Sequence, residues 1–136
     1  MVVNYRYWAV LYGLYIWVQA TLTIRWFGDA IFRPGEPFYM AFVFVVTIGL
    51  VYGAGWFFYR MFKLNGLDRA IAGIVICAAI CFANIPALLN TSWFFPDIKA
   101  GQLPWLAAWD LWGIGVGILT GILPNNLPGM SQGQWR

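Results

Sequence analysis

Histidine is absent from this sequence, and charged residues make up only 10% of it. Soluble domains contain roughly 25% charged residues. Without histidine, the chain lacks the usual axial ligand of haem, the commonest zinc ligand and the commonest proton-transfer side chain. The sequence also contains no phosphate-binding loop, no HExxH or CxxC motif and no nucleophile elbow. It has no run of basic residues, so we expect no nucleic-acid partner. No metal site is predicted.

Cysteine is scarce as well, with only Cys77 and Cys81. They lie four residues apart within an apolar segment, one helical turn from each other. A redox pair is one interpretation. We favour small packing residues, because no basic side chain flanks the thiols and no second thiol pair exists.

Apolar residues are abundant, at 62% of the 136 residues. A core of this size could not bury them all, so lipid must form part of the solvent. We predict an all-α integral membrane protein, a four-helix bundle in one transmembrane domain, 1–136. The apolar runs predict helices over 7–27, 38–62, 70–89 and 103–123, followed by a non-helical tail, 124–136. The short turn between the second and third helices predicts that these two pack as antiparallel neighbours.

Basic residues orient the predicted helices. Five would lie on the side of the termini, namely Arg6, Arg60, Lys63, Arg69 and Arg136. Three would lie on the other side, namely Arg25, Arg33 and Lys99. Since cytoplasmic loops carry the excess of lysine and arginine, we expect both termini on the cytoplasmic side of a multi-pass protein in a bacterial inner membrane.

Small residues recur at four-residue spacing in three predicted helices, which permits close approach of helix backbones. The final helix carries Gly113, Gly117 and Gly121, the second Gly49 and Gly53, and the third Ala79, Ala83 and Ala87. Packing within the bundle is the favoured interpretation. A docking face for a partner protein is the alternative.

Polar residues cluster at one predicted depth near the outer side, namely Arg25, Asp29, Asn84, Asn90 and Asp110. A salt bridge between Arg25 and Asp110 would compensate two charges that are costly in a membrane, and Asp29 is the competing partner. We favour an interhelical clamp over a ligand site or proton path, because one acid and one base form no continuous relay.

Aromatic residues make up 20% of the chain, including nine tryptophans. Most fall at predicted membrane interfaces, where amphipathic rings anchor a protein. Trp17 and Trp112 lie deeper, and we predict that they line a groove for a flat apolar ligand such as a lipid, carotenoid or quinone.

Three stretches resemble a family of small four-helix bacterial membrane proteins known as a domain of unknown function. They are Arg25-Trp26-Phe27-Gly28, the passage from Pro86 to Phe95-Pro96, and the run AAWDLWGIGVGILTGILP. The resemblance implies four transmembrane helices and no defined activity. It singles out Arg25, Gly28, Pro86, Pro96 and Asp110 as positions of interest.

Two functions follow as hypotheses. The first is a non-catalytic accessory or assembly subunit of a bacterial membrane complex, which contacts other membrane subunits and the lipid bilayer. The alternative is a small transporter or lipophilic-ligand binder that uses the Arg25/Asp110 cluster. An enzyme of lipid metabolism ranks third, because the chain offers no convincing general base.

Overall fold

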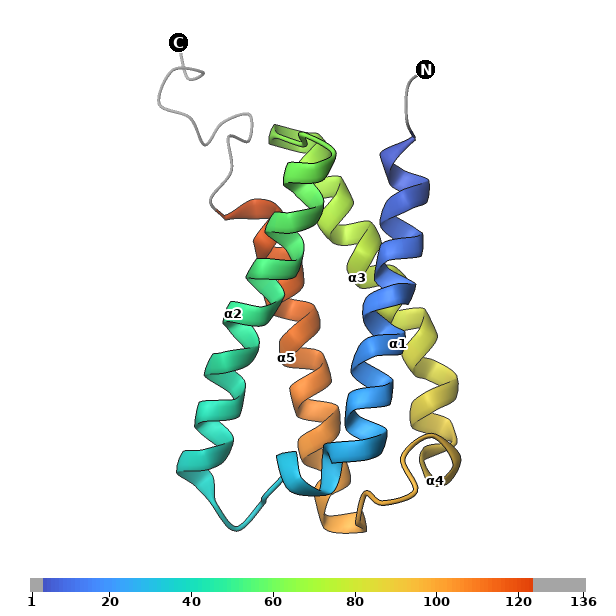
Figure 1. The fold of residues 1–136 in the computed structure, drawn as a ribbon, viewed down its shortest axis with the longest axis vertical. Helices are drawn as coiled ribbons and strands as arrows, with labels where there is room; N and C mark the ends of the chain where they lie inside the picture. Colours follow the sequence, from blue (N-terminus) through green and yellow to red (C-terminus); the bar gives the residue numbers. More distant parts are fainter. Residues whose placement is uncertain (1–3, 124–136) are drawn as a thin grey trace.

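The fold is a bundle of long helices in a computed structural model that describes residues 4–123 (Figure 1). The long helices are α1 (Tyr5–Ile31), α2 (Pro37–Met61), α3 (Gly66–Leu89) and α5 (Leu103–Ile122). A short helix α4 (Thr91–Phe94) and a 3-10 turn η1 (Ala100–Gln102) come between α3 and α5. The described part contains no strand, so the predicted all-α class is confirmed.

Helix α1 ends later than the predicted 27, and α3 begins at Gly66, before the predicted 70, while its end at Leu89 is as predicted. Helix α1 continues past Gly28 to Ile31, where a linker was expected. A Cβ at Gly28 would lie 2.6 Å from the Cδ1 of Ile98, so the glycine lets this side chain pack close to α1. Helix α3 runs through Pro86 and ends shortly afterwards, at Leu89. The predicted tail, 124–136, lies outside the described residues.

The long helices run alternately up and down, so α1 begins and α5 ends at the same end of the bundle (Figure 1). Helix α3 packs on α1 and α5, while α2 packs chiefly on α5. The second and third helices run antiparallel, as their short turn predicts, but they share few contacts and are not the main packing partners of each other (Figure 1). Helix α5 supplies the main surface for α2, and a Cβ at Gly55 of α2 would lie 2.8 Å from the Oγ1 of Thr120 on α5.

Three helical stretches are long and apolar enough to cross a membrane, namely Pro37–Met61, Gly66–Leu89 and Ala100–Ile122. Among the described residues, 4–123, helix α1 is long enough to cross a membrane but is not one of these three stretches. Tyrosine, glutamine and charged residues lower its mean hydropathy. Apolar side chains cover the outside of the bundle, and Phe82 is 73% exposed and Leu89 78% exposed. These features indicate a membrane protein.

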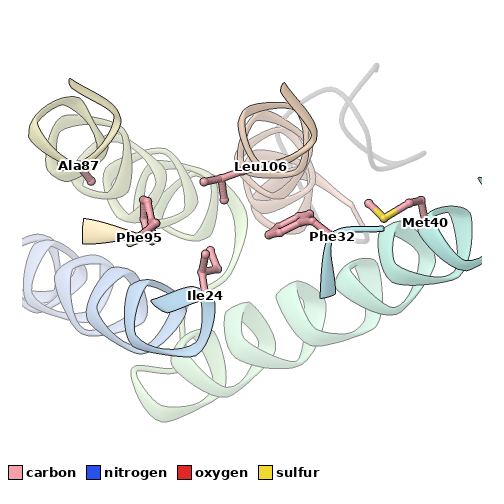
Figure 2. Packing of buried hydrophobic residues seen from close by; sticks show 6 residues of the cluster. All are labelled: Ile24, Phe32, Met40, Ala87, Phe95 and Leu106. Atoms are coloured by element: carbon pink, nitrogen blue, oxygen red, sulfur yellow. The ribbon is translucent and has the colours of Figure 1, made fainter. Parts of the chain in front are cut away.

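Buried side chains form one core at each end of the bundle. At the lower end in Figure 1, the core comprises Ile24, Phe32, Met40, Ala87, Phe95 and Leu106. Figure 2 shows Phe95 pointing into the space bounded by Ile24, Ala87 and Leu106. The core at the other end comprises Ala9, Phe58, Tyr59, Ala72 and Ile76. Between these two cores the packing of α1 against α2 is open, and this is where the groove described below lies.

The predicted small-residue faces divide into packed and open positions. Gly117 and Gly121 pack on α3, because a Cβ would lie 2.6 Å from the Sγ of Cys77 at Gly117 and 3.1 Å from the carbonyl oxygen of Arg69 at Gly121. On α3, Ala87 is fully buried and Ala79 and Ala83 are half-buried. Their burial is consistent with packing inside the bundle.

Three predicted packing glycines face open space instead. A Cβ added at Gly49, Gly53 or Gly113 would meet no atom within 4 Å. Gly49 and Gly53 are exposed on α2, whereas Gly113 lines the groove. Sequence spacing cannot separate these cases, because it gives the face of a helix but not what lies opposite.

Candidate functional site

A groove of about 420 Å³ lies between α1 and α2 and is lined also by α3 and α5. In the view of Figure 1, α5 appears between α1 and α2. Most lining side chains are apolar, among them Ile16, Leu50, Val51, Ile80 and Ile114. The volume falls within the range of small-molecule sites, roughly 300–1,000 Å³.

Aromatic side chains close the groove at both ends. At one end the Tyr12 hydroxyl donates to the carbonyl oxygen of Ala54 at 2.9 Å, which joins α1 to α2. At the other end the ring of Phe32 meets that of Trp109 edge-on, with centroids 6.0 Å apart. The indole nitrogen of Trp109 donates to the Thr47 hydroxyl at 2.7 Å, which fixes α5 against α2.

Asp110 is the one carboxylate among the described residues that line the groove. The Nδ2 atom of Asn84 donates to both of its oxygens, each at 2.7 Å. The Oδ1 atom of Asn84 accepts from the indole nitrogen of Trp17 at 2.8 Å. A chain of hydrogen bonds thus connects α1, α3 and α5 and orients Asp110, because Asn84 is held at both ends of its amide.

The predicted salt bridge between Arg25 and Asp110 is wrong. The Nη1 atom of Arg25 donates to the carbonyl oxygens of Trp93 at 2.7 Å and Phe94 at 3.3 Å. These carbonyls belong to the end of α4, where backbone acceptors have no partner within the helix. Arg25 therefore fastens α4 to α1.

The competing pairing of Arg25 with Asp29 is also wrong. The Oδ1 atom of Asp29 lies 3.2 Å from the Nζ atom of Lys99 and accepts from the Nε2 atom of Gln102 at 3.1 Å. Asn90 donates to the carbonyl oxygen of Pro86 in its own helix. Of the five predicted cluster residues, only Asn84 and Asp110 therefore bond to each other.

The predicted tryptophan-lined groove exists in a different form. Neither Trp17 nor Trp112 is among the residues that line it. Trp17 points to Asn84, and the indole nitrogen of Trp112 donates to the carbonyl oxygen of Phe44 at 3.0 Å. The lining tryptophan is Trp109. Trp17 and Trp112 were predicted from their depth along the helix. Whether a tryptophan faces the groove depends instead on its angle around the helix axis.

A buried glutamine was missed by sequence reasoning. The side chain of Gln102 is buried, and its Nε2 atom donates to the carbonyl oxygen of Phe32 at 2.6 Å and to Asp29. Its Oε1 atom accepts from the backbone nitrogen of Lys99 at 2.8 Å. This last bond is one half of a capping box at η1, in which a glutamine at the third helical position accepts from the backbone nitrogen of the N-cap residue.

Comparison with known proteins adds one match. A family model described as a family of unknown function (DUF5367) matches residues 31–127, which is more than half of the chain. The chain belongs to the DUF5367 family. Two of the three stretches on which the resemblance rested, the Pro86–Pro96 passage and the run containing Asp110, lie inside the matched residues, and Arg25–Gly28 lies outside them. No curated protein and no solved structure matches.

Within this DUF5367 member the groove offers binding chemistry. Asp110 presents two carboxylate oxygens, and the hydroxyls of Thr47, Tyr59 and Thr120 lie elsewhere along the lining. In residues 4–123 no three histidine, cysteine, aspartate or glutamate side chains gather as a metal site would require. A carboxylate in a mainly apolar groove recognises a ligand with an apolar body and a hydroxyl or amino group.

Proposed function

We propose that this protein binds a lipophilic small molecule in the groove between α1 and α2, with Asp110 accepting a hydrogen bond from the ligand. The observation that carries the proposal is the groove itself, about 420 Å³ with one carboxylate among its described lining residues. Candidate ligands are a lipid with a hydroxyl or amino group, a quinone in its quinol form, whose hydroxyl can donate, or a carotenoid with a hydroxyl end group. A transporter for such a molecule would use the same site.

Two glycines provide a matched test of the groove. Gly113 and Gly49 both face open space, but Gly113 lines the groove and Gly49 lies on the outside of α2. Gly113→Leu should fill part of the groove and reduce the amount of ligand that co-purifies, whereas Gly49→Leu should leave it unchanged. Native mass spectrometry and organic extraction of the protein, purified in mild detergent, measure the bound molecule. Equal ligand content in both variants would refute the groove as the site.

The role of Asp110 is tested by Asp110→Asn. The substituted amide keeps an oxygen that can accept from Asn84 but loses the charge and one acceptor. We expect the helix content to persist and ligand binding or transport to fall. Unchanged binding in Asp110→Asn would remove Asp110 from the proposal while leaving the groove.

For topology we propose that α1 is a fourth transmembrane helix, over 7–27, and that both termini face the cytoplasm of a bacterial inner membrane. The start of α1, the α2–α3 turn and the end of α5 share one end of the bundle, and this end carries Arg6, Arg60, Lys63 and Arg69 (Figure 1). The excess of basic residues supports a cytoplasmic side. A C-terminal alkaline phosphatase fusion should be inactive, and a fluorescent-protein fusion at the same residue should fluoresce. The reverse pattern would overturn the orientation.

A second candidate function is an accessory subunit of a membrane complex. The support is the outer face of α2, where Gly49 and Gly53 lie exposed with no atom opposite them. Small residues allow a helix of another membrane subunit to approach closely. Blue-native electrophoresis after gentle extraction tests this function: the combined change Gly49→Leu/Gly53→Leu should release the protein from a large complex, and Gly113→Leu should not. A wild-type protein that migrates alone would exclude it.

A further inference from the structure

A second, smaller pocket of about 270 Å³ lies at the α2–α3 turn, away from Asp110. Its described lining residues are Trp56, Tyr59, Arg60, Lys63, Leu64, Asn65 and Arg69. Three of these side chains are cationic and none is a carboxylate. The pocket shares only Tyr59 with the groove, so it can be tested separately from the proposed function.

The three cations have no acidic partner in the described chain. The ion pairs of residues 4–123 are Arg33–Glu36 and Lys99–Asp29, which lie at the other end of the bundle (Figure 1). Asp68, next to Arg69 in the sequence, accepts from the Tyr5 hydroxyl at 2.7 Å and does not line the pocket. Among the described residues, no acidic side chain therefore compensates the positive charge of the pocket.

Arg69 is held in place by its surroundings. Its Nε and Nη2 atoms donate to the carbonyl oxygen of Thr120 at 3.2 and 2.9 Å, and its guanidinium lies 4.9 Å from the centre of the Tyr59 ring. The Nη1 atom takes part in neither bond. Arg60 lies similarly over Trp56, at 5.2 Å. Stacking on aromatic rings orients both guanidinium groups, which lowers the entropy lost when they bind an anion.

Lys63 occupies a backbone position that favours glycine. Its φ is 53°, in the left-handed region. The Leu64 nitrogen donates to the Tyr59 carbonyl oxygen at 2.8 Å, and the Lys63 nitrogen donates to that of Arg60 at 3.2 Å. This pattern resembles the Schellman ending of a helix, in which glycine is usual at the Lys63 position. A lysine there places a third charge at the pocket despite the less favourable backbone.

We propose that this pocket binds the phosphate group of an anionic membrane lipid. Arginine matches phosphate by paired hydrogen bonds, and basic pockets at the ends of membrane helices bind lipid headgroups. The surroundings fit a lipid: Trp56 and Phe57 are 57% and 56% exposed at the end of an apolar helix. The acyl chains would lie along that apolar surface while the phosphate reaches the cations. A soluble phosphate offers the same anion without the chains.

The test compares two variants with the same change in charge. Arg60→Gln/Lys63→Gly removes two pocket cations, and glycine suits the backbone at 63, so the turn should form normally. Arg6→Gln/Arg33→Gln removes two cations outside the pocket. The full chain is placed in nanodiscs of phosphatidylcholine with a minority of phosphatidylglycerol, and native mass spectrometry then measures the phosphatidylglycerol retained. A second arm measures thermal stabilisation in detergent by inorganic phosphate and by glycerol phosphate.

We expect retention of phosphatidylglycerol to fall about fivefold for each pocket cation removed, while the control variant stays near wild type. A different result would assign the same site to a free phosphate: the soluble phosphates stabilise the wild type but not the pocket variant, and both proteins retain the same amount of phosphatidylglycerol. Equal behaviour of the two variants in both arms would overturn the proposal. The melting temperature of Lys63→Gly alone should not fall below that of wild type, which keeps a negative result interpretable.

Discussion

The Nδ2 atom of Asn84 donates to both oxygens of Asp110 at 2.7 Å, and this relationship joins the C-terminal part of α3 to α5. The carboxylate thereby gains a neutral partner in place of the arginine that its charge alone would favour. Asn84 brings no charge of its own to the site. Asp110 can therefore be both a structural contact and a ligand acceptor.

Removing the amide of Asn84 should destabilise the bundle. Asn84→Leu leaves Asp110 without its donor and the indole nitrogen of Trp17 without its acceptor. We expect the free energy of unfolding to fall by about 2–3 kcal/mol, the scale of a hydrogen bond to a charged group. Titration of helicity with denaturant in mixed micelles measures it.

Two further variants control this prediction. Asn90→Leu makes the same chemical change at an exposed site and should have a small effect. Adding Asp110→Leu to Asn84→Leu should recover the part of the lost stability that is due to the unpaired carboxylate, while the indole nitrogen of Trp17 still lacks its acceptor. Failure of the double variant to recover would show that Asn84 acts through something other than Asp110.

Gly13 should tolerate no larger side chain. A Cβ there would lie 2.6 Å from the Ile76 carbonyl oxygen and 3.0 Å from the Cβ of Ala79, so α1 would have to move away from α3. We expect Gly13→Ala to cost ~1–3 kcal/mol, as overpacking does. Gly49→Ala meets no atom within 4 Å and should be neutral or slightly stabilising, because alanine favours helix. Equal unfolding free energies for the two variants would contradict the packing of α1 on α3.

Arg25 should control the stability of the segment that contains α4. Arg25→Met keeps an apolar stem but removes the donor to the Trp93 and Phe94 carbonyls. We expect the amides of residues 91–98 to exchange with deuterium about tenfold faster, corresponding to one lost charged hydrogen bond. Arg33→Met, an identical change at an exposed residue, should leave this exchange unaltered. Unchanged exchange in Arg25→Met would show that the core around Phe95 holds the segment by itself.

Asp29 should contribute a pH dependence. The hydrogen bonds to Lys99 and Gln102 lower the pKa of its carboxyl below the usual range; this exposed residue lies beyond the proposed membrane-spanning stretch 7–27. Because the folded-state pKa is depressed, the stabilisation is complete above the unfolded-state pKa of about 3.9 and is lost as pH falls through the folded-state value. The melting temperature of the wild type should fall as the pH is lowered below 4, and this fall should be smaller in Asp29→Asn. Glu36→Gln removes a different exposed carboxylate and serves as the control.

The polar cluster illustrates what a sequence can and cannot predict. The sequence predicted that Asn84 and Asp110 lie at the same depth, because both are near the same membrane side of antiparallel helices. The predicted partners of Arg25 and Asp29 were wrong, since both residues bond to the segment between α3 and α5, which follows an irregular path. No spacing rule describes such a path.

The sequence by itself determined the all-α class, the membrane character and the family, because apolar runs of sufficient length leave helices in lipid as the only way to satisfy the backbone. Only the tertiary structure decided which helices touch. It placed α5 against both α2 and α3, left the groove between α1 and α2, and gathered Arg60, Lys63 and Arg69 around one pocket. The reason is that contacts between helices depend on the rotation of each helix about its axis, which is set by the close approaches at Gly13, Gly117 and Gly121.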